Sequence, residues 1–197
     1  DESFEALSKL GNHLPSKDFY FREGATWSTI ASGPISFRFV SGSVFETKGS
    51  ICFPRTGTST KYLLGLLNSK TTQKFLEALS PNLDYHEGPL RKVPYVDNVI
   101  GVDEIVATLI ELSKFDFDCD ECSVEFARFP LIGNQRDRVT IQHSWDQWQQ
   151  QCSDRRASLS CGEEALNRLF INAFGLQDEL TPEVPESEIT LARADRE

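Results

Sequence analysis

The chain has 197 residues, of which 39% are hydrophobic, and it carries 20 Lys+Arg against 30 Asp+Glu, a formal net charge of −10. This length suffices for one domain or two small ones. The longest apolar run, Tyr62–Leu67, is far shorter than the roughly 20 residues that cross a bilayer, and no basic-then-apolar segment opens the chain. We therefore predict a cytoplasmic protein with neither a transmembrane helix nor a membrane partner.

The sulfur-containing residues set two further expectations. No Met occurs anywhere, position 1 included, which predicts that the chain is a segment of a longer protein. The five cysteines are odd in number and irregularly spaced, unlike a secreted disulfide framework. Cys119 and Cys122 form a CxxC pair, but no second short-spaced pair of Cys or His accompanies it. We predict free thiols and no metal site.

Charge is distributed unevenly along the sequence. Residues 1–100 hold 11 basic and 10 acidic side chains, whereas residues 101–197 hold 9 and 20. Within the first half, residues 48–95 carry seven basic side chains against three acidic ones. Because neutralising phosphates requires clustered cations, a nucleic-acid surface would have to lie in the first half. The alternative interpretation is the chance unevenness of a solvated surface.

The first part of the chain predicts β structure after a short helix over residues 1–10. Residues 19–53 are rich in aromatic and β-branched side chains and are punctuated by glycine-containing turns. Apolar and polar residues alternate over residues 35–39 and again over residues 44–48. This alternation predicts short antiparallel strands joined by tight turns.

The pattern then becomes helical. Apolar residues at helical spacing predict one helix around Tyr62–Leu67, which Ser59 can cap, and a second helix that carries Phe75–Leu79. The glycine and proline of residues 85–89 predict a loop. Residues 90–96 predict a closing strand, and their proline, which has no N–H to donate, predicts a position at the sheet edge.

The second half is acidic and predicts mainly helices. Asp103 is the expected cap of one helix, residues 115–138 show no clear period, and Ser144 with Gln147 forms a capping box that is expected to open a second helix. A narrow apolar stripe along that helix consists of Trp145, Trp148, Cys152 and Leu159. A stronger helical pattern ends at Gly175, and the tail after Pro182 predicts no structure of its own.

These elements predict an α+β fold. We expect a small antiparallel β-rich domain with packed short helices over residues 1–98 and an acidic helical spacer over residues 99–197. A narrow stripe, unlike a broad apolar face, suits a helix that packs against a partner.

Patterns of catalytic residues are missing from the sequence. It has no phosphate-binding P-loop, dinucleotide-binding glycine pattern or nucleophile elbow, and none of its three histidines adjoins a recognisable nucleophile. The acidic run Asp116–Glu121 lacks the ligand spacing of an EF-hand loop. We predict no catalytic residue and no metal ligand in this chain, and the residues alone leave open whether it takes part in an enzyme.

The segment Arg22–Arg38 is chemically distinctive. It places small hydroxyl residues, one tryptophan and two arginines around glycine turns. Loops of this kind can approach a sugar-phosphate backbone closely and form hydrogen bonds to phosphates and base edges. The alternative is a hairpin whose Trp27 packs into the core and whose serines only form turns.

Two sets of segments resemble known families. Thr60–Lys70 (TKYLLGLLNSK), continued through Phe75–Pro81 to Arg91–Tyr95 (RKVPY), is similar to the target-recognition domains of adenine-specific DNA methyltransferases and of type I and IIG restriction-modification enzymes. Four further pieces resemble the PglX-type methyltransferases of the BREX phage-defence systems. These pieces are Phe21–Ser28, Ser32–Arg38, Leu166–Leu180 and Thr181–Pro185.

This resemblance implies a parent enzyme that transfers a methyl group from S-adenosylmethionine to adenine N6 after extruding the base from the duplex. The Asn/Asp-Pro-Pro-Tyr/Phe motif and the glycine-rich cofactor motif of such enzymes are absent from this chain. The chain is therefore expected to be a DNA target-recognition domain that binds no cofactor itself. The implied partners are double-stranded DNA, the missing methyltransferase domain, and other phage-defence proteins or phage-encoded DNA mimics.

Eleven residues are candidates for DNA contact. The expected phosphate or guanine contacts are Arg22, Arg38, Arg55 and Lys61. The expected close groove contacts are Thr26, Trp27, Ser28, Ser32, Thr58, Tyr85 and His86. The competing hypothesis is a protein–protein interaction module of a defence complex without direct DNA contact, held together by the stripe of Trp145 and Trp148.

Overall fold

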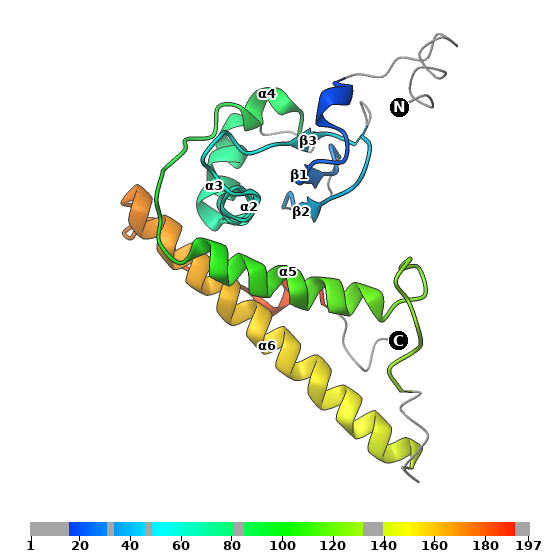
Figure 1. Ribbon diagram of the computed structural model, residues 1–197. Helices are drawn as coiled ribbons and strands as arrows, with labels where there is room; N and C mark the ends of the chain where they lie inside the picture. The colour runs from blue at the N-terminus through cyan, green and yellow to red at the C-terminus, as the bar shows by residue number, and fades with distance from the viewer. Residues whose placement is uncertain (1–15, 31–33, 46–48, 81–84, 132–139, 192–197) are drawn as a thin grey trace, which may run out of the picture. The chain divides into compact units, whose positions relative to one another are not determined.

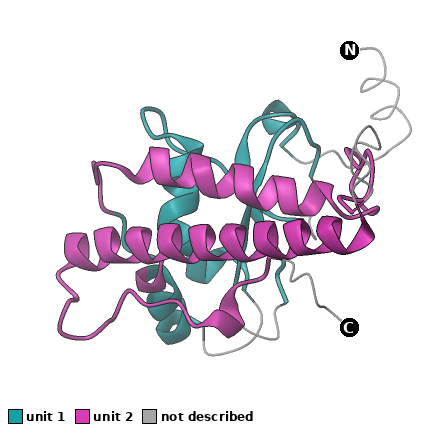
Figure 2. Cartoon of the chain, turned by 90° about the horizontal axis from the view of Figure 1, so that it is seen from below, with its two compact units in different colours: residues 1–68, 72–95 teal, residues 69–71, 96–197 magenta. Residues whose placement is uncertain are grey.

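A computed structural model describes residues 16–30, 34–45, 49–80, 85–131 and 140–191. The chain divides into two compact units, of which unit 1 comprises residues 1–68 and 72–95 and unit 2 comprises residues 69–71 and 96–197 (Figure 2). The strands belong to unit 1, whereas unit 2 is built around two long helices (Figure 1). The predicted α+β class is confirmed. Within the described ranges, no helix has the length and apolar character to cross a membrane.

Unit 1 contains a three-stranded antiparallel sheet in the order β2-β1-β3. The strands are β1 (Gly24–Trp27), β2 (Phe37–Val40) and β3 (Ile51–Cys52). Side chains alternate between the faces of a strand, so one face carries the buried Ala25 and Trp27 and the other carries Thr26. The predicted alternation at residues 35–39 thus corresponds to β2. Residues 44–45 form no strand, and the remainder of that predicted strand lies outside the described residues, as does the predicted helix over residues 1–10.

Two consecutive helices supply much of the core of unit 1, α2 (Thr60–Asn68) and α3 (Lys70–Leu79). Both were predicted from their apolar spacing. Ser59 caps α2 as expected, because its Oγ accepts a hydrogen bond from the backbone N–H of Tyr62 at 2.9 Å. The side chains of Leu64, Leu66, Leu67 and Leu76 are buried. The short 3₁₀ helix η1 (Lys17–Phe19) precedes the sheet.

Amide side chains satisfy the outer edge of β2. The Phe37 N–H donates to Asn68 Oδ1 and Asn68 Nδ2 donates to the Phe37 carbonyl, both at 2.9 Å. Gln73 Nε2 donates to the Ile35 carbonyl at 2.6 Å. Asn68 therefore takes the position of a neighbouring strand at Phe37.

The prediction of a closing strand over residues 90–96 is wrong. Glu87–Leu90 form the short helix α4, and residues 91–96 form turns and irregular backbone instead of a strand. The Lys92 and Val93 N–H groups donate to the Pro89 and Leu90 carbonyls, which bends the chain immediately after α4. This bend brings Tyr95 against Tyr62, with ring centroids 6.2 Å apart.

Unit 2 is built on α5 (Val102–Asp118) and α6 (Ile141–Phe174), which lie side by side (Figures 1 and 2). The two helices approach closely at Gly162, where an added Cβ would lie 2.6 Å from Leu109 Cδ2. Asp103 does not cap α5, because the helix begins after Gly101, whose φ of 90° favours glycine. Asp103 instead lies in the first turn, where a carboxylate interacts favourably with the helix dipole.

The long helix α6 replaces two predicted helices. The Thr140 hydroxyl caps it by accepting from the His143 N–H at 3.2 Å, so the predicted capping box at Ser144 is wrong. No proline interrupts the 34 residues, and packing against α5 accommodates Gly162. The stripe residues Trp148, Cys152 and Leu159 are buried, and Gly175 ends the helix with a φ of 70°, as predicted.

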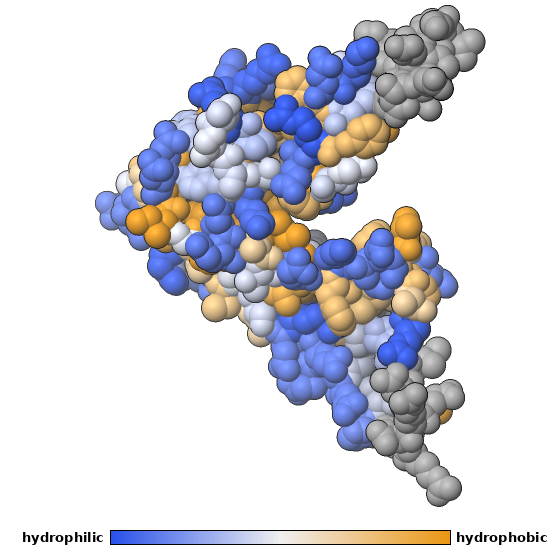
Figure 3. All heavy atoms as spheres, in the orientation of Figure 1, coloured by the Kyte–Doolittle hydropathy of each residue, from blue (hydrophilic) through white to orange (hydrophobic). Residues whose placement is uncertain are grey.

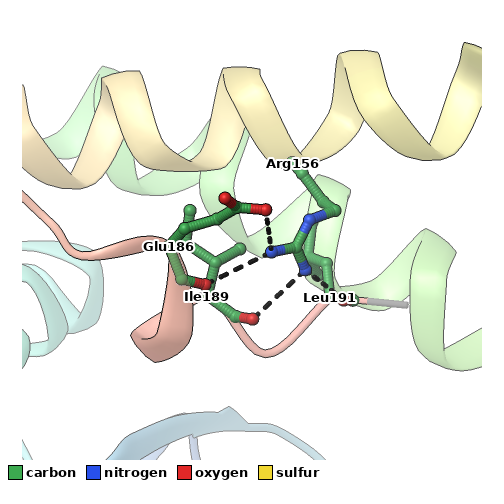
Figure 4. Close-up of polar contacts among 4 residues, drawn as sticks. All are labelled: Arg156, Glu186, Ile189 and Leu191. Carbon is green, nitrogen blue, oxygen red and sulfur yellow. Dashed lines mark hydrogen bonds and ion pairs between the residues drawn. The ribbon is translucent and has the colours of Figure 1, made fainter. Parts of the chain in front are cut away.

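The C-terminal segment was expected to lack structure, and the described part contradicts this. It folds back along α6 and includes the 3₁₀ helix η2 (Glu186–Glu188). Arg156, buried in α6, donates hydrogen bonds to the carbonyls of Glu186, Ile189 and Leu191 at 2.7–3.3 Å (Figure 4). Asn167 donates to the Pro182 carbonyl at 3.1 Å. Sequence patterns missed this segment because its order comes from contacts distant in sequence, not from local periodicity.

Replacing Asn68 by alanine should destabilise unit 1 by about 1–3 kcal/mol, because the N–H and carbonyl of the buried Phe37 would lose their partners. Urea unfolding followed by tryptophan fluorescence measures this change. Lys74→Ala, an exposed change on the next helix, is the matched control. Equal midpoints for the two variants would show that Asn68 does not replace a strand partner.

A second prediction concerns pH. Burial, followed by the charge of Glu188, raises the pKa of Glu163 from 4.5 to about 7. A raised folded-state pKa gives stability that is fully present below pH 4.5 and is lost as the pH rises through about 7. Glu163→Gln should therefore stabilise the chain at pH 8, by on the order of 2–3 kcal/mol, and change little at pH 4.

Thermal unfolding of the Glu163→Gln variant across this pH range tests that expectation. Glu104→Gln, an exposed change on α5, provides the control. A stability gain that is the same at low and high pH would contradict the assignment.

Candidate nucleic-acid interface

One candidate surface is the face of the sheet opposite the core, here called the open sheet face and defined by Arg22, Thr26, Ser28 and Arg38. Thr26 pairs with Arg38 across β1 and β2, which places both side chains on this face. Ser28 follows Thr26 by two residues, and its Oγ accepts a hydrogen bond from Arg38 Nη2 at 2.7 Å. Ser28 and Arg38 are both exposed. The structure therefore brings three of the predicted residues together, with the guanidinium held by a neighbouring hydroxyl.

Arg22 occupies the approach to β1. Its guanidinium carbon lies 4.9 Å from the centroid of the Phe19 ring and 5.6 Å from that of Phe53. Phe53 also covers Gly24, where an added Cβ would lie 2.6 Å from Ile51 Cγ2 and 3.3 Å from the Phe53 ring. Cation–π contact with two rings restrains Arg22 while leaving it exposed.

Trp27 has a different role from the one predicted. It is only 3% exposed, its ring centroid lies 5.6 Å from that of Phe37, and its Nε1–H donates to the Tyr85 carbonyl at 2.8 Å. The Tyr85 N–H in turn donates to the Thr29 carbonyl at 2.6 Å. Trp27 thus packs in the core and fixes the backbone at Tyr85, and it does not line the surface as a groove contact would.

A second candidate surface, the Tyr95 patch, combines two separate parts of unit 1. Its members are Arg55, Thr58, Lys61, Arg91, Lys92 and Tyr95. The hydroxyls of Thr58 and Tyr95 are hydrogen-bonded at 3.1 Å, and Tyr95 is 43% exposed. All four basic side chains are exposed and lie within four residues of Thr58 or Tyr95 in the sequence. In Figure 3, the visible surface over α4 and the loop after it is mainly hydrophilic.

Glu87 is the acidic residue of unit 1 that lies nearest to this patch in the sequence. Hydrogen bonding from the Ser50 hydroxyl, in the first place, lowers the pKa of Glu87, and the charges of His86 and Arg91 act in the same direction. Glu87 is therefore ionised at neutral pH, in the first turn of α4. His86, one of the predicted contacts, is exposed immediately before this helix.

The sequence predicts a candidate site that contains Arg55, Thr58 and Lys61 but not Arg91, Lys92 or Tyr95. The available signal was the absence of acidic residues from positions 88–96. The proline and β-branched residues within residues 90–96 instead predict an edge strand. Ser32, another candidate, lies outside the described residues.

Lys70 does not contribute to either surface. Its Nζ donates to the Glu183 carbonyl at 2.6 Å, and its backbone N–H donates to Asn167 Oδ1 at 2.8 Å. These bonds assign it to unit 2, together with Ser69 and Thr71. Lys70 is one of the seven basic residues that suggested a nucleic-acid surface over residues 48–95, but its hydrogen bonds stabilise the fold instead.

The five cysteines are free. Burial raises the pKa of Cys52 to about 11 and is also the main cause of raised pKa values at Cys119 and Cys152. Hydrogen bonding to Asp120 raises the pKa of Cys122. The thiols of these four cysteines are thus protonated at neutral pH and are poor nucleophiles. Among the described residues, no three His, Cys, Asp or Glu side chains are grouped so that they could hold a metal ion.

Most of the chain is similar to segments of two adenine-specific methyltransferases. No family model matches it. It is 35% identical over 191 residues to the adenine-specific methyltransferase PglX of Lacticaseibacillus casei (strain Zhang), a match that covers 94% of this chain and 16% of that protein. It is 27% identical over 178 residues to the adenine-specific methyltransferase BrxX of Escherichia coli O9:H4 (strain HS), covering 89% of this chain and 14% of that protein. The chain thus spans about one sixth of the length of the relatives it matches.

Proposed function

We propose that unit 1 is the DNA target-recognition module of a PglX-type adenine-N6 methyltransferase whose catalytic domain lies outside this chain. The observation that carries this proposal is the open sheet face, on which Arg38 is held by Ser28 beside Thr26. The similarity of nearly the whole chain to a segment of two adenine-specific methyltransferases supports it.

The chemistry of the open sheet face suits DNA. An arginine guanidinium offers paired donors that match guanine O6 and N7 or two phosphate oxygens. The exposed Ser28 hydroxyl keeps its own hydrogen for a base edge while it accepts from Arg38, whereas the half-buried Thr26 hydroxyl donates to the Ser50 carbonyl at 2.9 Å. The Ser28 hydroxyl limits the orientations of Arg38, which reduces the entropy lost when the guanidinium meets DNA. Arg22 is restrained in the same way by its aromatic neighbours.

In the parent protein, this module would position the duplex so that the catalytic domain meets the correct adenine. S-adenosylmethionine would bind that domain and supply the methyl group for the extruded base. A role in BREX phage defence, a cytoplasmic location, and interaction with other defence proteins or phage DNA mimics belong to the same proposal.

The acidic unit 2 suits a protein contact better than a DNA contact. Phe117 and Val124 are 58% and 99% exposed near the end of α5, where they could pack against the methyltransferase domain. Trp148, part of the stripe that motivated the competing interaction-module hypothesis, is buried beside Phe129 and Arg155 in the same unit. Much of that stripe is therefore already covered by this chain.

Titration of the chain with duplex DNA at several salt concentrations tests the proposal. We expect affinity to fall steeply with salt, and the double variant Arg22→Ala with Arg38→Ala to bind at least about tenfold more weakly, since contacts of this kind are each worth about 1–3 kcal/mol. Lys74→Ala, which removes an exposed cation bonded to Glu77, is the control. Binding that is insensitive to salt and to the double variant would favour the interaction-module hypothesis.

A domain exchange tests the role in the parent enzyme. Residues 15–95 are swapped between two homologues that methylate different sequences, and the methylated site is mapped. The recognised sequence should follow the exchanged segment. If specificity stays with the catalytic part, unit 1 is not the recognition module.

A further inference from the structure

We propose that the Tyr95 patch binds the DNA sugar-phosphate backbone independently of sequence and so sets the strength of docking, whereas the open sheet face approaches the bases. This inference rests on the proposed function and divides its work between two surfaces. It assigns a phosphodiester ligand to Arg55, Thr58, Lys61, Arg91, Lys92 and Tyr95.

The Tyr95 patch is rich in positive charge. The patch contributes four cations, and Glu87 and Asp97 are the acidic residues that flank its second segment in the sequence. At roughly 3.5 Å per residue, four residues of chain span at most about 14 Å, so the Cα atom of each of the four basic residues lies within that distance of the Cα atom of Thr58 or Tyr95. DNA carries one charge per ~3.4 Å along each strand, so several phosphates fall within this reach.

The patch also holds a pair of hydrogen-bonded hydroxyls, those of Thr58 and Tyr95. Thr58 Oγ1 and Tyr95 Oη lie 3.1 Å apart, and either one can be the donor. Whichever hydroxyl donates, the other retains its own hydrogen, which can then donate to an external acceptor. The pair is exposed, and a phosphate oxygen surrounded by cations is the strongest acceptor that such a donor can meet.

Contacts within unit 1 restrain both members of the hydroxyl pair. The Thr58 N–H donates to the Arg55 carbonyl at 3.0 Å across a turn in which Gly57 has a φ of 91°, a conformation that favours glycine. Tyr95 is fixed from the other side by its ring contact with Tyr62. The hydroxyls are therefore held in place, while the cations lie on long exposed arms. Fixed hydroxyls with adaptable cations suit a repeating, uniform backbone, whereas the restrained Arg38 suits a defined base edge.

The test measures the salt dependence of DNA binding by variants of the whole chain. Arg55→Gln with Lys61→Gln, and separately Arg91→Gln with Lys92→Gln, should each lower the slope of log affinity against log salt concentration by about 2, one per lost phosphate contact. The loss should be equal for duplexes of unrelated sequence. Lys74→Gln, an exposed cation of unit 1 outside the patch, should leave the slope unchanged.

Four outcomes would overturn the assignment. If the wild-type chain binds DNA and neither double variant changes the slope, the patch does not contact the backbone, although the proposed function stands. If the loss differs between DNA sequences, the patch contacts bases instead. If inorganic phosphate, added at constant ionic strength, saturates the patch by NMR while duplex DNA does not, the patch is a site for free anions. A wild-type chain that fails to bind DNA at all would remove the proposed function together with this inference.

Discussion

The alternation of side chains along β1 is the constraint on which the candidate interface depends. Ala25 and Trp27 are buried, and the two-residue period then leaves Thr26 and Ser28 no position except the opposite face. Pairing with β2 places Arg38 beside them. Burial of Ala25 and Trp27 in the core therefore also places the polar side chains on the opposite face of the sheet. A register shift of one residue would exchange the two faces.

Polar side chains form hydrogen bonds to backbone groups that neighbouring strands would satisfy in a larger sheet. Asn68 satisfies the Phe37 backbone at the edge of β2, and the Trp27 indole joins the segment at Tyr85 to the sheet. In unit 2, Arg156 plays the corresponding part for the C-terminal segment by satisfying three carbonyls at once. Each interaction joins segments distant in sequence, and a small unit whose described part holds a three-stranded sheet gains long-range order from them.

The two units differ in electrostatics as well as in structure. Basic side chains of unit 1 gather around Tyr95 and on the open sheet face, whereas the second half of the chain holds 20 acidic groups against 9 basic ones. The net negative charge of the chain therefore comes from its second half and does not describe the candidate surfaces of unit 1.

The sequence by itself determined the features that depend on local periodicity and on composition: the helices α2 and α3, the strand around Phe37, the end of α6 at Gly175, and the charge asymmetry. It also carried the resemblance to PglX-type methyltransferases, which similarity to a segment of such enzymes supports. Tertiary structure alone decided that Trp27 is buried, that the chain bends after α4 so that Tyr95 meets Tyr62 and Thr58, and that the C-terminal segment lies along α6. These features come from contacts between distant segments, whose energies are not encoded in the pattern of either segment taken alone.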